Sequence, residues 1–214
     1  MAQPKGNGQF HFPRLLFFEY LSYMQKRGIV PVIIFGLSSF LAGQVPGAST
    51  IADFRQAARP ISGWNIQGFA DTVMGGNSVL QSPTLVDTAT GRALRLAGQV
   101  VTRGGGFIQV QLEHEKRRFN GSGYSGVEIE VVALKPGSYY LFARTRDNVF
   151  PWSYYGKPLS LTENPQTLRI PWSEFESEAT LRRTIRPDRL SSLAIVAAYQ
   201  DFEAEVLVYQ IGFY

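Results

Sequence analysis

The chain has 214 residues, of which 44% are hydrophobic, and a net charge of +4. This length suits one well-buried domain and is short for two. The excess charge lies at the N-terminus: residues 1–50 carry four basic side chains and one acidic one, which leaves 17 basic and 16 acidic side chains in the remaining 164 residues. A domain so close to neutrality argues against a nucleic-acid partner. No cysteine is present, which excludes disulfides, thiol catalysis and cysteine zinc sites.

The N-terminal segment has the order of a secretory signal. A basic run at 24–27 precedes the apolar stretch Ile29–Ala42, and small residues follow it. The apolar stretch is shorter than the ~20 residues that cross a bilayer. We interpret residues 1–50 as a targeting or tether segment, with Met24 as a possible true start, and 51–214 as the folded domain. Export to the periplasm or beyond is the favoured interpretation, and an uncleaved membrane anchor and an organelle transit peptide are the alternatives.

The domain has the two-residue period of β-strands. Glu128 and Glu130 alternate with apolar neighbours, so both should face water while the strand's other face is buried. Many short strands separated by Gly-, Pro- and Asn-containing turns predict an all-β fold, a single antiparallel sandwich. The expected strands are Ala93–Val101, Phe107–Leu112, Val127–Val131, Ser138–Thr145, Gln166–Ile170, Leu193–Ala198 and Glu205–Phe213. Helix is scarce, and one short helical turn is expected over Ser173–Leu181, where Ser173 and Glu176 form a possible capping box.

Two glycine-dense turns form the first candidate binding site. The segments Asp71–Ser78 and Arg103–Phe107 each flank an expected strand, and clustered glycines indicate positive φ angles or close backbone approach. We expect the two turns to meet at one rim of the sandwich, with Asp71 fixing the turn. The candidate residues are Asp71, Met74, Gly75, Gly76, Asn77, Ser78 and Arg103. The alternative is that both segments are only tight hairpin turns.

An aromatic run over Val149–Tyr155 forms the second candidate site. Its rings could stack on a ligand or anchor a partner, with nearby arginines as hydrogen-bond donors. The candidate residues are Arg144, Arg146, Trp152 and Tyr154. In the alternative interpretation, Trp152 and Tyr154 are packing residues on opposite surfaces. The tryptophans at 64 and 172 are expected to pack in the core or at strand edges.

Catalytic chemistry finds little support. His11 lies in the targeting segment, and His114 is expected in a solvated loop at a strand end, so no Ser/His/Asp triad or histidine metal site is indicated. Glu128 and Glu130 share one strand face and do not oppose each other across a cleft. We predict no catalytic residue, no metal site and no cofactor, and expect that the protein is not an enzyme. An oxygen-ligand calcium site stays open, with Asp71, Asp87, Asp147 and Asp201 as possible ligands.

The segment Asp71-x-Val73-Met74-Gly75-Gly76-x-Ser78 resembles the signature of the complex I intermediate-associated protein 30 family. Further blocks resemble that family in the same order, over roughly residues 62–213. They are Trp64, Leu96-x-Gly98, Gly104–Phe107, Tyr124-x-Gly126-Val127-x-Ile129, Tyr139–Thr145, Tyr154-Tyr155, Ile170–Phe175, Gln200-x-Phe202 and Val206–Ile211. The resemblance implies a galactose-binding-like jelly roll and a chaperone role in assembling respiratory complex I, the NADH:ubiquinone oxidoreductase. Gln200-Asp201 stands where the family usually has glycine-proline, so this turn departs from the pattern.

Two hypotheses on function follow. In the first, the domain is a non-enzymatic assembly factor that binds protein partners, respiratory-complex subunits among them, through the glycine-turn rim and the aromatic run. In the second, it is an exported module that stacks a carbohydrate on Trp152 and Tyr154, with Arg144, Arg146 or Asp147 bonding to hydroxyls. In both, contact with a membrane is expected at most through the N-terminal segment, and no nucleic acid is involved.

Overall fold

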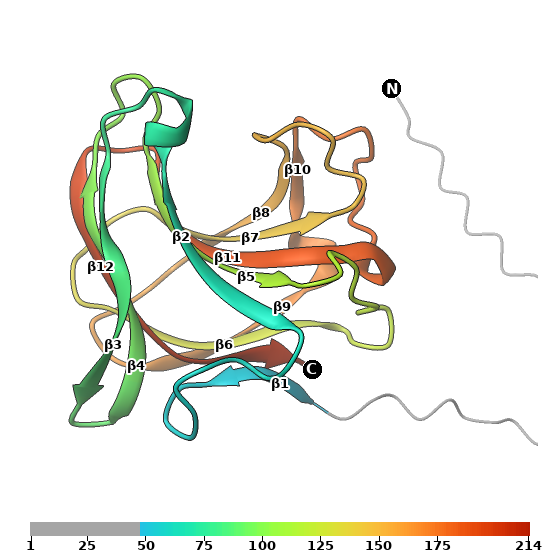
Figure 1. Cartoon of the computed structure of the whole chain (residues 1–214), viewed down its shortest axis with the longest axis horizontal. Helices are drawn as coiled ribbons and strands as arrows, with labels where there is room; N and C mark the ends of the chain where they lie inside the picture. The colour runs from blue at the N-terminus through green and yellow to red at the C-terminus, as the bar shows by residue number, and fades with distance from the viewer. Residues whose placement is uncertain (1–47) are drawn as a thin grey trace, which may run out of the picture. The chain divides into compact units, whose positions relative to one another are not determined.

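The structure, a computed structural model, describes residues 48–214 (Figure 1). In this part of the chain, twelve strands form two antiparallel sheets, and the only helical pieces are three 3₁₀ turns. These turns are η1 (Asp71–Met74), η2 (Trp172–Glu174) and η3 (Pro187–Arg189). The predicted all-β jelly-roll sandwich is confirmed. The predicted targeting segment falls almost wholly outside the described residues.

The first sheet has the strand order β3-β4-β12-β6-β9. Strand β12 is long enough to pair with β4 through residues 202–208 and, beyond that, with β1 through residues 210–213. The bounds are β1 (Ser49–Asp53), β3 (Val79–Thr88), β4 (Gly91–Val100), β6 (Gly126–Ala133), β9 (Gln166–Pro171) and β12 (Phe202–Phe213). Strand β1 begins two residues before the domain start expected at residue 51.

The second sheet has the strand order β10-β8-β7-β11-β5-β2. Its bounds are β2 (Trp64–Ala70), β5 (Phe107–His114), β7 (Tyr139–Thr145), β8 (Tyr154–Leu159), β10 (Glu176–Glu178) and β11 (Leu190–Ala198). Strand β11 lies in the middle, between β7 and β5. Figure 1 shows this sheet crossing the molecule, with β2 and β10 at its two edges.

The hydrophobic core lies between the sheets, and the alternation of side chains in each strand decides what enters it. In β11, Leu193, Ile195 and Ala197 belong to the main core, whereas Ala194, Val196 and Ala198 form a separate apolar cluster with side chains of β5 and β7. Successive side chains of a strand point to opposite faces. The second sheet therefore presents its other face outside the core.

Some elements were not predicted from the sequence. Strands β1, β2, β3, β8 and β10 were missed, and β3 shows why: its pairing with β4 shifts register between Gln81 and Thr84, where Pro83 interrupts the pattern at the sheet edge. The helical turn predicted over Ser173–Leu181 is wrong in extent. Turn η2 covers only Trp172–Glu174 and has no side-chain cap, and residues 176–178 pair with β8 as an edge strand, so sheet pairing overrides the local capping pattern.

The glutamates of β6 lie outside the core as predicted, but an arginine partner covers each, so the side chains of Glu130 and Glu128 are only 24% and 20% exposed. Glu130 accepts two hydrogen bonds from the Arg55 guanidinium at 2.5 and 2.6 Å, and Glu128 accepts one from Arg169 at 2.6 Å. Such two-pronged pairs hold their geometry better than single contacts. The hydrogen bonds from Arg55 lower the pKa of Glu130 below its usual value.

The prediction that His114 lies in a solvated loop is wrong. His114 is the last residue of β5 and is half-buried, with its ring edge-on to Trp64 at 5.2 Å and tilted against Phe119 at 5.9 Å. Trp64 lies in the core as predicted, and Trp172 packs against the core while its Nε1–H donates to the carbonyl of Tyr124 at 2.8 Å. His114 is thus part of an aromatic cluster that includes Trp64.

Candidate functional site

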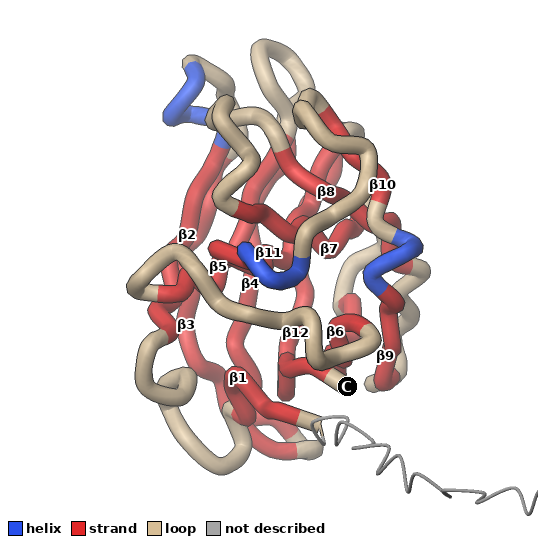
Figure 2. The backbone as a smooth tube through the Cα atoms, turned by 90° about the vertical axis from the view of Figure 1, so that its right-hand side faces the viewer, coloured by secondary structure: helices blue, strands red, loops and turns tan. Residues whose placement is uncertain are grey.

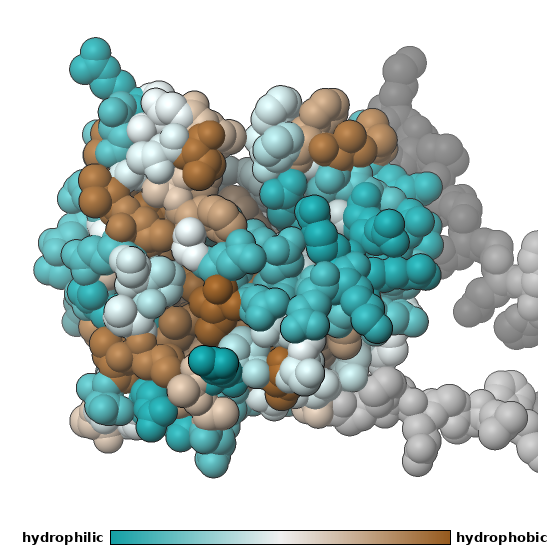
Figure 3. Space-filling view, in the orientation of Figure 1, coloured by the Kyte–Doolittle hydropathy of each residue, from teal (hydrophilic) through white to brown (hydrophobic). Residues whose placement is uncertain are grey.

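A groove of about 1110 Å³ lies on the outer face of the second sheet. Strands β2, β5, β7, β8 and β11 supply its floor, and residues next to the strands supply its walls. Figure 3 shows a notch at the top of the molecule with hydrophobic surface on both sides. A groove of this size is large enough for a ligand of several rings or for an extended peptide.

The floor of the groove lies close to the sheet because the middle strand, β11, carries small side chains there. Ala194 and Ala198 of β11 line the floor, and the residues paired with them on the adjacent strand β5 are Gln111 and Phe107. The amide nitrogen of Gln109 lies 3.5 Å from the amide oxygen of Gln111, and the amide nitrogen of Gln67 lies 3.4 Å from the Glu113 carboxylate. The floor therefore offers amide donors and acceptors beside an apolar strip.

One wall is the turn η1, which a buried carboxylate holds in place. Asp71 is 0% exposed and accepts three hydrogen bonds, from the Ser78 N–H at 2.9 Å, the Ser78 hydroxyl at 2.8 Å and the Gly106 N–H at 2.5 Å. The last bond ties the two glycine-dense turns together, as predicted. Asn77 adds a second link, since its amide donates to the Arg103 carbonyl at 2.9 Å.

The glycines allow the backbone to close around this carboxylate. A Cβ atom on Gly76 would lie 2.5 Å from each oxygen of Asp71, and one on Gly105 would lie 2.6 Å from Oδ2. Gly75 has a different role, because it ends η1 with a φ of +86° and has open space around it. The turn therefore needs Gly76 for close approach and Gly75 for its backbone conformation.

These contacts divide the first set of candidate residues. Asp71 and Ser78 are buried, so they position the turn and leave ligand contact to its exposed side chains. Val73 and Met74 are exposed and line the groove, whereas the side chains of Asn77 and Arg103 are not among its lining. Of this set, Met74 is the candidate that reaches the groove.

The opposite wall carries Trp152, which is 55% exposed and stacks on Phe150 with ring centroids 5.3 Å apart. The turn that presents it is fixed through one carbonyl. The oxygen of Phe150 accepts hydrogen bonds from the Ser153 N–H at 3.0 Å, the Ser153 hydroxyl at 2.8 Å and the Arg144 guanidinium at 2.9 Å. Trp152 is therefore an exposed aromatic side chain on a well-anchored turn.

Tyr154 continues this wall. Its ring stacks on Phe142 with centroids 3.8 Å apart, and its hydroxyl is hydrogen-bonded to that of Tyr199. Burial raises the pKa of Tyr154, and the bond to Tyr199 raises it further, so the phenol stays protonated. Trp152 and Tyr154 both line the groove, and the alternative that placed them on opposite surfaces is wrong.

The two arginines of the second candidate set lie in different places. Arg144 is half-buried in the groove, where burial lowers its pKa and the nearby Arg117 lowers it further. Arg117 itself pairs with Glu113 at 3.2 Å. Arg146 is exposed outside the groove and its N–H donates to the Arg189 carbonyl. Of the two candidate arginines, only Arg144 can therefore act on a ligand in the groove, where Arg117 lies beside it.

Several groove residues were missed from the sequence. Phe69, Phe142 and Tyr199 line it although no motif marks them. The alternation of β5, which sends Gln109 and Gln111 away from the core, was the one available signal. A single strand shows which side chains share a face, but not which strands lie beside it.

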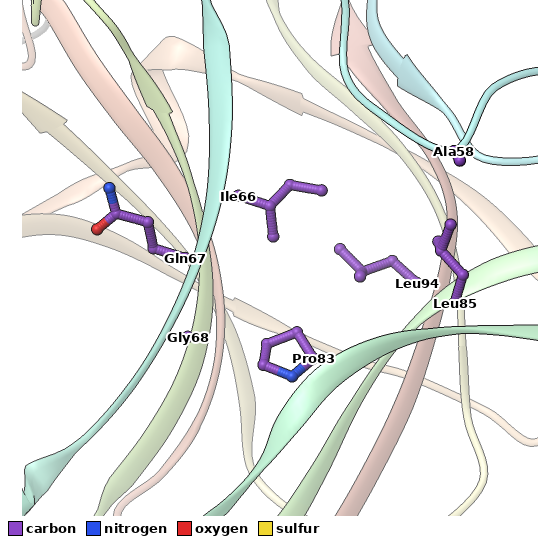
Figure 4. Close-up of a pocket in the computed structure, with 7 residues that line it drawn as sticks. All are labelled: Ala58, Ile66, Gln67, Gly68, Pro83, Leu85 and Leu94. Atoms are coloured by element: carbon purple, nitrogen blue, oxygen red, sulfur yellow. The ribbon is translucent and has the colours of Figure 1, made fainter.

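A second hollow, of about 270 Å³, lies between the facing edges of β2 and β3. Figure 4 shows Ile66, Pro83, Leu85 and Leu94 around the gap, with Gln67 turned away from it. Its lining lacks charged side chains, and it is a small seam between the two sheets. The larger groove is the better candidate site.

Some classes of site have no counterpart in residues 48–214. This part of the chain holds no group of three or more His, Cys, Asp or Glu side chains placed to bind a metal ion. The aspartates considered for calcium serve elsewhere: Asp147 pairs with Arg189 at 2.5 Å, and Asp201 accepts from the Thr102 N–H and hydroxyl at 2.6 and 2.7 Å. No helix among these residues has the length and apolar character of a membrane span.

The sequence profile of the family described as "Complex I intermediate-associated protein 30" matches residues 52–204. The chain belongs to this family. The matched residues of this complex I intermediate-associated protein 30 domain include the buried Asp71 turn and strands β2 to β11. No curated protein matches the chain.

Solved structures share the fold. A family 11 carbohydrate-binding module from Clostridium thermocellum, in complex with a β-1,3-1,4-mixed-linked tetrasaccharide, aligns over 78% of this chain and 94% of its own with 12% identity and a TM-score of 0.58. The family 11 module of the Clostridium thermocellum cellulase Lic26A-Cel5E aligns over the same shares with 13% identity and a TM-score of 0.59. These likenesses show the fold alone.

Proposed function

We propose that the protein is a non-enzymatic binding protein that assists the assembly of a membrane oxidoreductase of the respiratory complex I kind. Membership of the complex I intermediate-associated protein 30 family supports this proposal. The observation that carries it is the pair of exposed apolar walls, Val73 and Met74 on one side and Trp152 on the other. Exposed apolar and aromatic side chains around a groove are typical of protein contact sites.

In this proposal the groove holds an extended segment of a partner subunit. The turns that carry Met74 and Trp152 are each fixed by several hydrogen bonds, so little ordering is needed on binding. Such preorganisation favours affinity because the cost of immobilising loops is already met by folding. The amides of the floor would bond to the partner's backbone, which needs no particular side chain.

The test is affinity purification of the full chain under gentle solubilisation. We expect NADH:quinone oxidoreductase subunits to copurify with the native protein and to be lost with the double variant Met74→Ala/Trp152→Ala. The matched control is Leu134→Ala, an exposed apolar side chain outside the groove. Recovery of no oxidoreductase subunit with the native chain, or equal recovery with the double variant, would refute the proposal.

A second candidate function is the binding of an oligosaccharide in the same groove. The observation that favours it is the combination of aromatic rings, Trp152 and Tyr154, with the amides of Gln109 and Gln111. Rings cover the faces of sugars and amides bond to hydroxyls. The similar Clostridium module holds a mixed-linked tetrasaccharide, which makes that compound the first probe. Titration calorimetry should show binding that Trp152→Ala removes, and silence across a glycan array would reject this candidate.

The compartment separates the two candidates. Export would favour a carbohydrate ligand, whereas residence with the respiratory membrane would favour assembly. Fractionation of the native protein, with detection in the periplasmic, membrane and soluble pools, tests the predicted targeting role of residues 1–50.

A further inference from the structure

Three loops from different parts of the sequence meet at one end of the sandwich. They are the β5–β6 loop (115–125), the β7–β8 loop (146–153) and the β10–β11 loop (179–189). Backbone hydrogen bonds join them: Phe119 to Leu190 at 2.6 Å, Gly121 to Pro187 at 2.8 Å and Arg146 to Arg189 at 3.0 Å. Figure 2 looks onto this end, with the three loops toward the viewer. We call these loops together the basic end.

The basic end carries more positive charge than the whole chain. Its three loops hold eight basic side chains and three acidic ones, a net charge of +5, whereas the whole chain has a net charge of +4. Asp147 lies beneath Arg182 and Arg189 and pairs with both, at 3.7 and 2.5 Å. Figure 3 shows strongly hydrophilic surface on this side of the molecule.

Half of these cations are free of acidic partners. Within residues 48–214, no ion pair involves Lys116, Arg118, Arg146 or Arg183, and all four are exposed. They come from all three loops. Their charges are therefore available to an external anion, and their clustering on one end gives a field that a scattered set would not give.

Exposed aliphatic side chains stand among the arginines. Leu181 is 78% exposed and is followed directly by Arg182 and Arg183, and Val149 is 67% exposed in the same loop as Arg146. Apolar tips flanked by arginines match the interface of a bilayer, where the tips enter the acyl region and the guanidinium groups meet the headgroups.

The chain enters the domain at this same end. Ser49 at the start of β1 pairs with Phe213, and the Phe213 ring stacks on Phe119 of the β5–β6 loop with centroids 4.9 Å apart. In the sequence, only residues 43–48 separate β1 from the apolar stretch Ile29–Ala42. Six residues span roughly 20 Å at most. In the sequence, the apolar stretch is therefore joined to this end of the domain by a short segment.

We propose that the basic end is a docking surface for the anionic headgroups of a membrane. The basic end would add to the membrane affinity that the apolar stretch supplies, because one weak anchor binds a membrane reversibly and two give stable attachment. The proposal goes beyond the binding function of the groove and rests on the unpaired cations Lys116, Arg118, Arg146 and Arg183, none of which lines the groove, although the β7–β8 loop also carries Trp152. A membrane-docked basic end would hold the domain at the surface where a membrane oxidoreductase is built.

The test measures partition of the full chain onto vesicles of phosphatidylcholine alone and of phosphatidylcholine with about a third of anionic phosphatidylglycerol. The variant is Arg118→Gln/Arg146→Gln/Arg183→Gln. The matched control, Arg59→Gln/Arg92→Gln/Lys135→Gln, removes three cations elsewhere, of which Arg59 and Arg92 are exposed and Lys135 is half-exposed. Each basic side chain near an anionic surface strengthens binding about fivefold, so the variant should lose roughly 100-fold on anionic vesicles at low salt.

The expected pattern has three parts. Binding to anionic vesicles falls in the variant and not in the control, binding to phosphatidylcholine alone is unchanged, and added salt removes the difference. A second variant, Lys116→Gln/Leu181→Ser, serves if the first fails to fold. Equal losses in variant and control, or equal binding to both kinds of vesicle, would overturn the proposal. The proposal would also be overturned if the variant still bound vesicles but no longer copurified with protein subunits, because the partner of the basic end would then be an acidic protein surface.

Discussion

Replacing Asp71 by Asn tests the claim that a buried carboxylate holds the ligand-binding wall. The substitution keeps the volume of the side chain and removes its charge. The new amide oxygen can still accept from the Ser78 N–H, and the amide nitrogen can donate to the Ser78 hydroxyl. The N–H of Gly106, which now donates at 2.5 Å, would face a nitrogen that cannot accept.

The magnitude follows from that one unsatisfied group and the lost charge. A buried donor left without a partner costs about 1–3 kcal/mol, and hydrogen bonds to a charged acceptor are each stronger than neutral ones. We expect a loss of about 2–3 kcal/mol in the free energy of unfolding. For a domain of this size, 1 kcal/mol lowers the melting temperature by roughly 2–4 °C, so the variant should melt about 4–12 °C lower.

The assay is urea denaturation with a thermal melt, and Asp87→Asn is the matched control. The Asp87 side chain is exposed and its pair with Arg92 is 3.6 Å long, so the control should change stability by less than about 0.5 kcal/mol. If Asp71→Asn is as stable as the native chain, the carboxylate does not hold the two turns together.

A double-mutant cycle sharpens the test. Gly76→Ala would place a Cβ against the Asp71 carboxylate and should cost about 1–3 kcal/mol. Much of that cost should vanish in an Asp71→Ala background, where the overlapping atoms are gone. Gly75→Ala should cost about 1–2 kcal/mol in both backgrounds, because its positive φ is strained whatever stands at position 71. Equal costs for Gly76→Ala in both backgrounds would contradict the overlap.

Three further predictions can be checked separately. Glu130→Gln should lower the free energy of unfolding by about 1 kcal/mol at neutral pH. Because Arg55 lowers the pKa of Glu130, this stabilisation is present above the unfolded pKa of 4.5 and is lost as the pH falls below it. The urea midpoints of the variant and the native chain should therefore converge in acid. Trp152→Ala should weaken binding in the groove at least tenfold with an unchanged melting temperature, since its side chain is exposed; a lower melting temperature would show a structural role. Ser153→Ala should also weaken binding, by loosening the turn that presents Trp152, and equal affinity measured by calorimetry would count against preorganisation.

Much of the fold could be predicted because its central strands carry clean alternation. Strand β6, with Glu128 and Glu130 outward, needs no neighbour to be recognised. Strands β3 and β10 were missed because an edge strand buries less of its surface and tolerates Pro83 or three polar residues. His114 looked solvated in a charged run, and only the approach of Trp64 from β2 makes it part of an aromatic cluster.

The sequence by itself determined the fold class, the family and the glycine turn, since period-two alternation and positive-φ glycines are local properties of the chain. The tertiary structure decided what those parts do. It buried Asp71 as the link between two turns, and it placed Met74 and Trp152 on facing walls. It also gathered arginines from three loops at one end, where the sequence alone assigned membrane contact only to its N-terminal segment. Sites arise from strand order and loop proximity, which no single segment encodes.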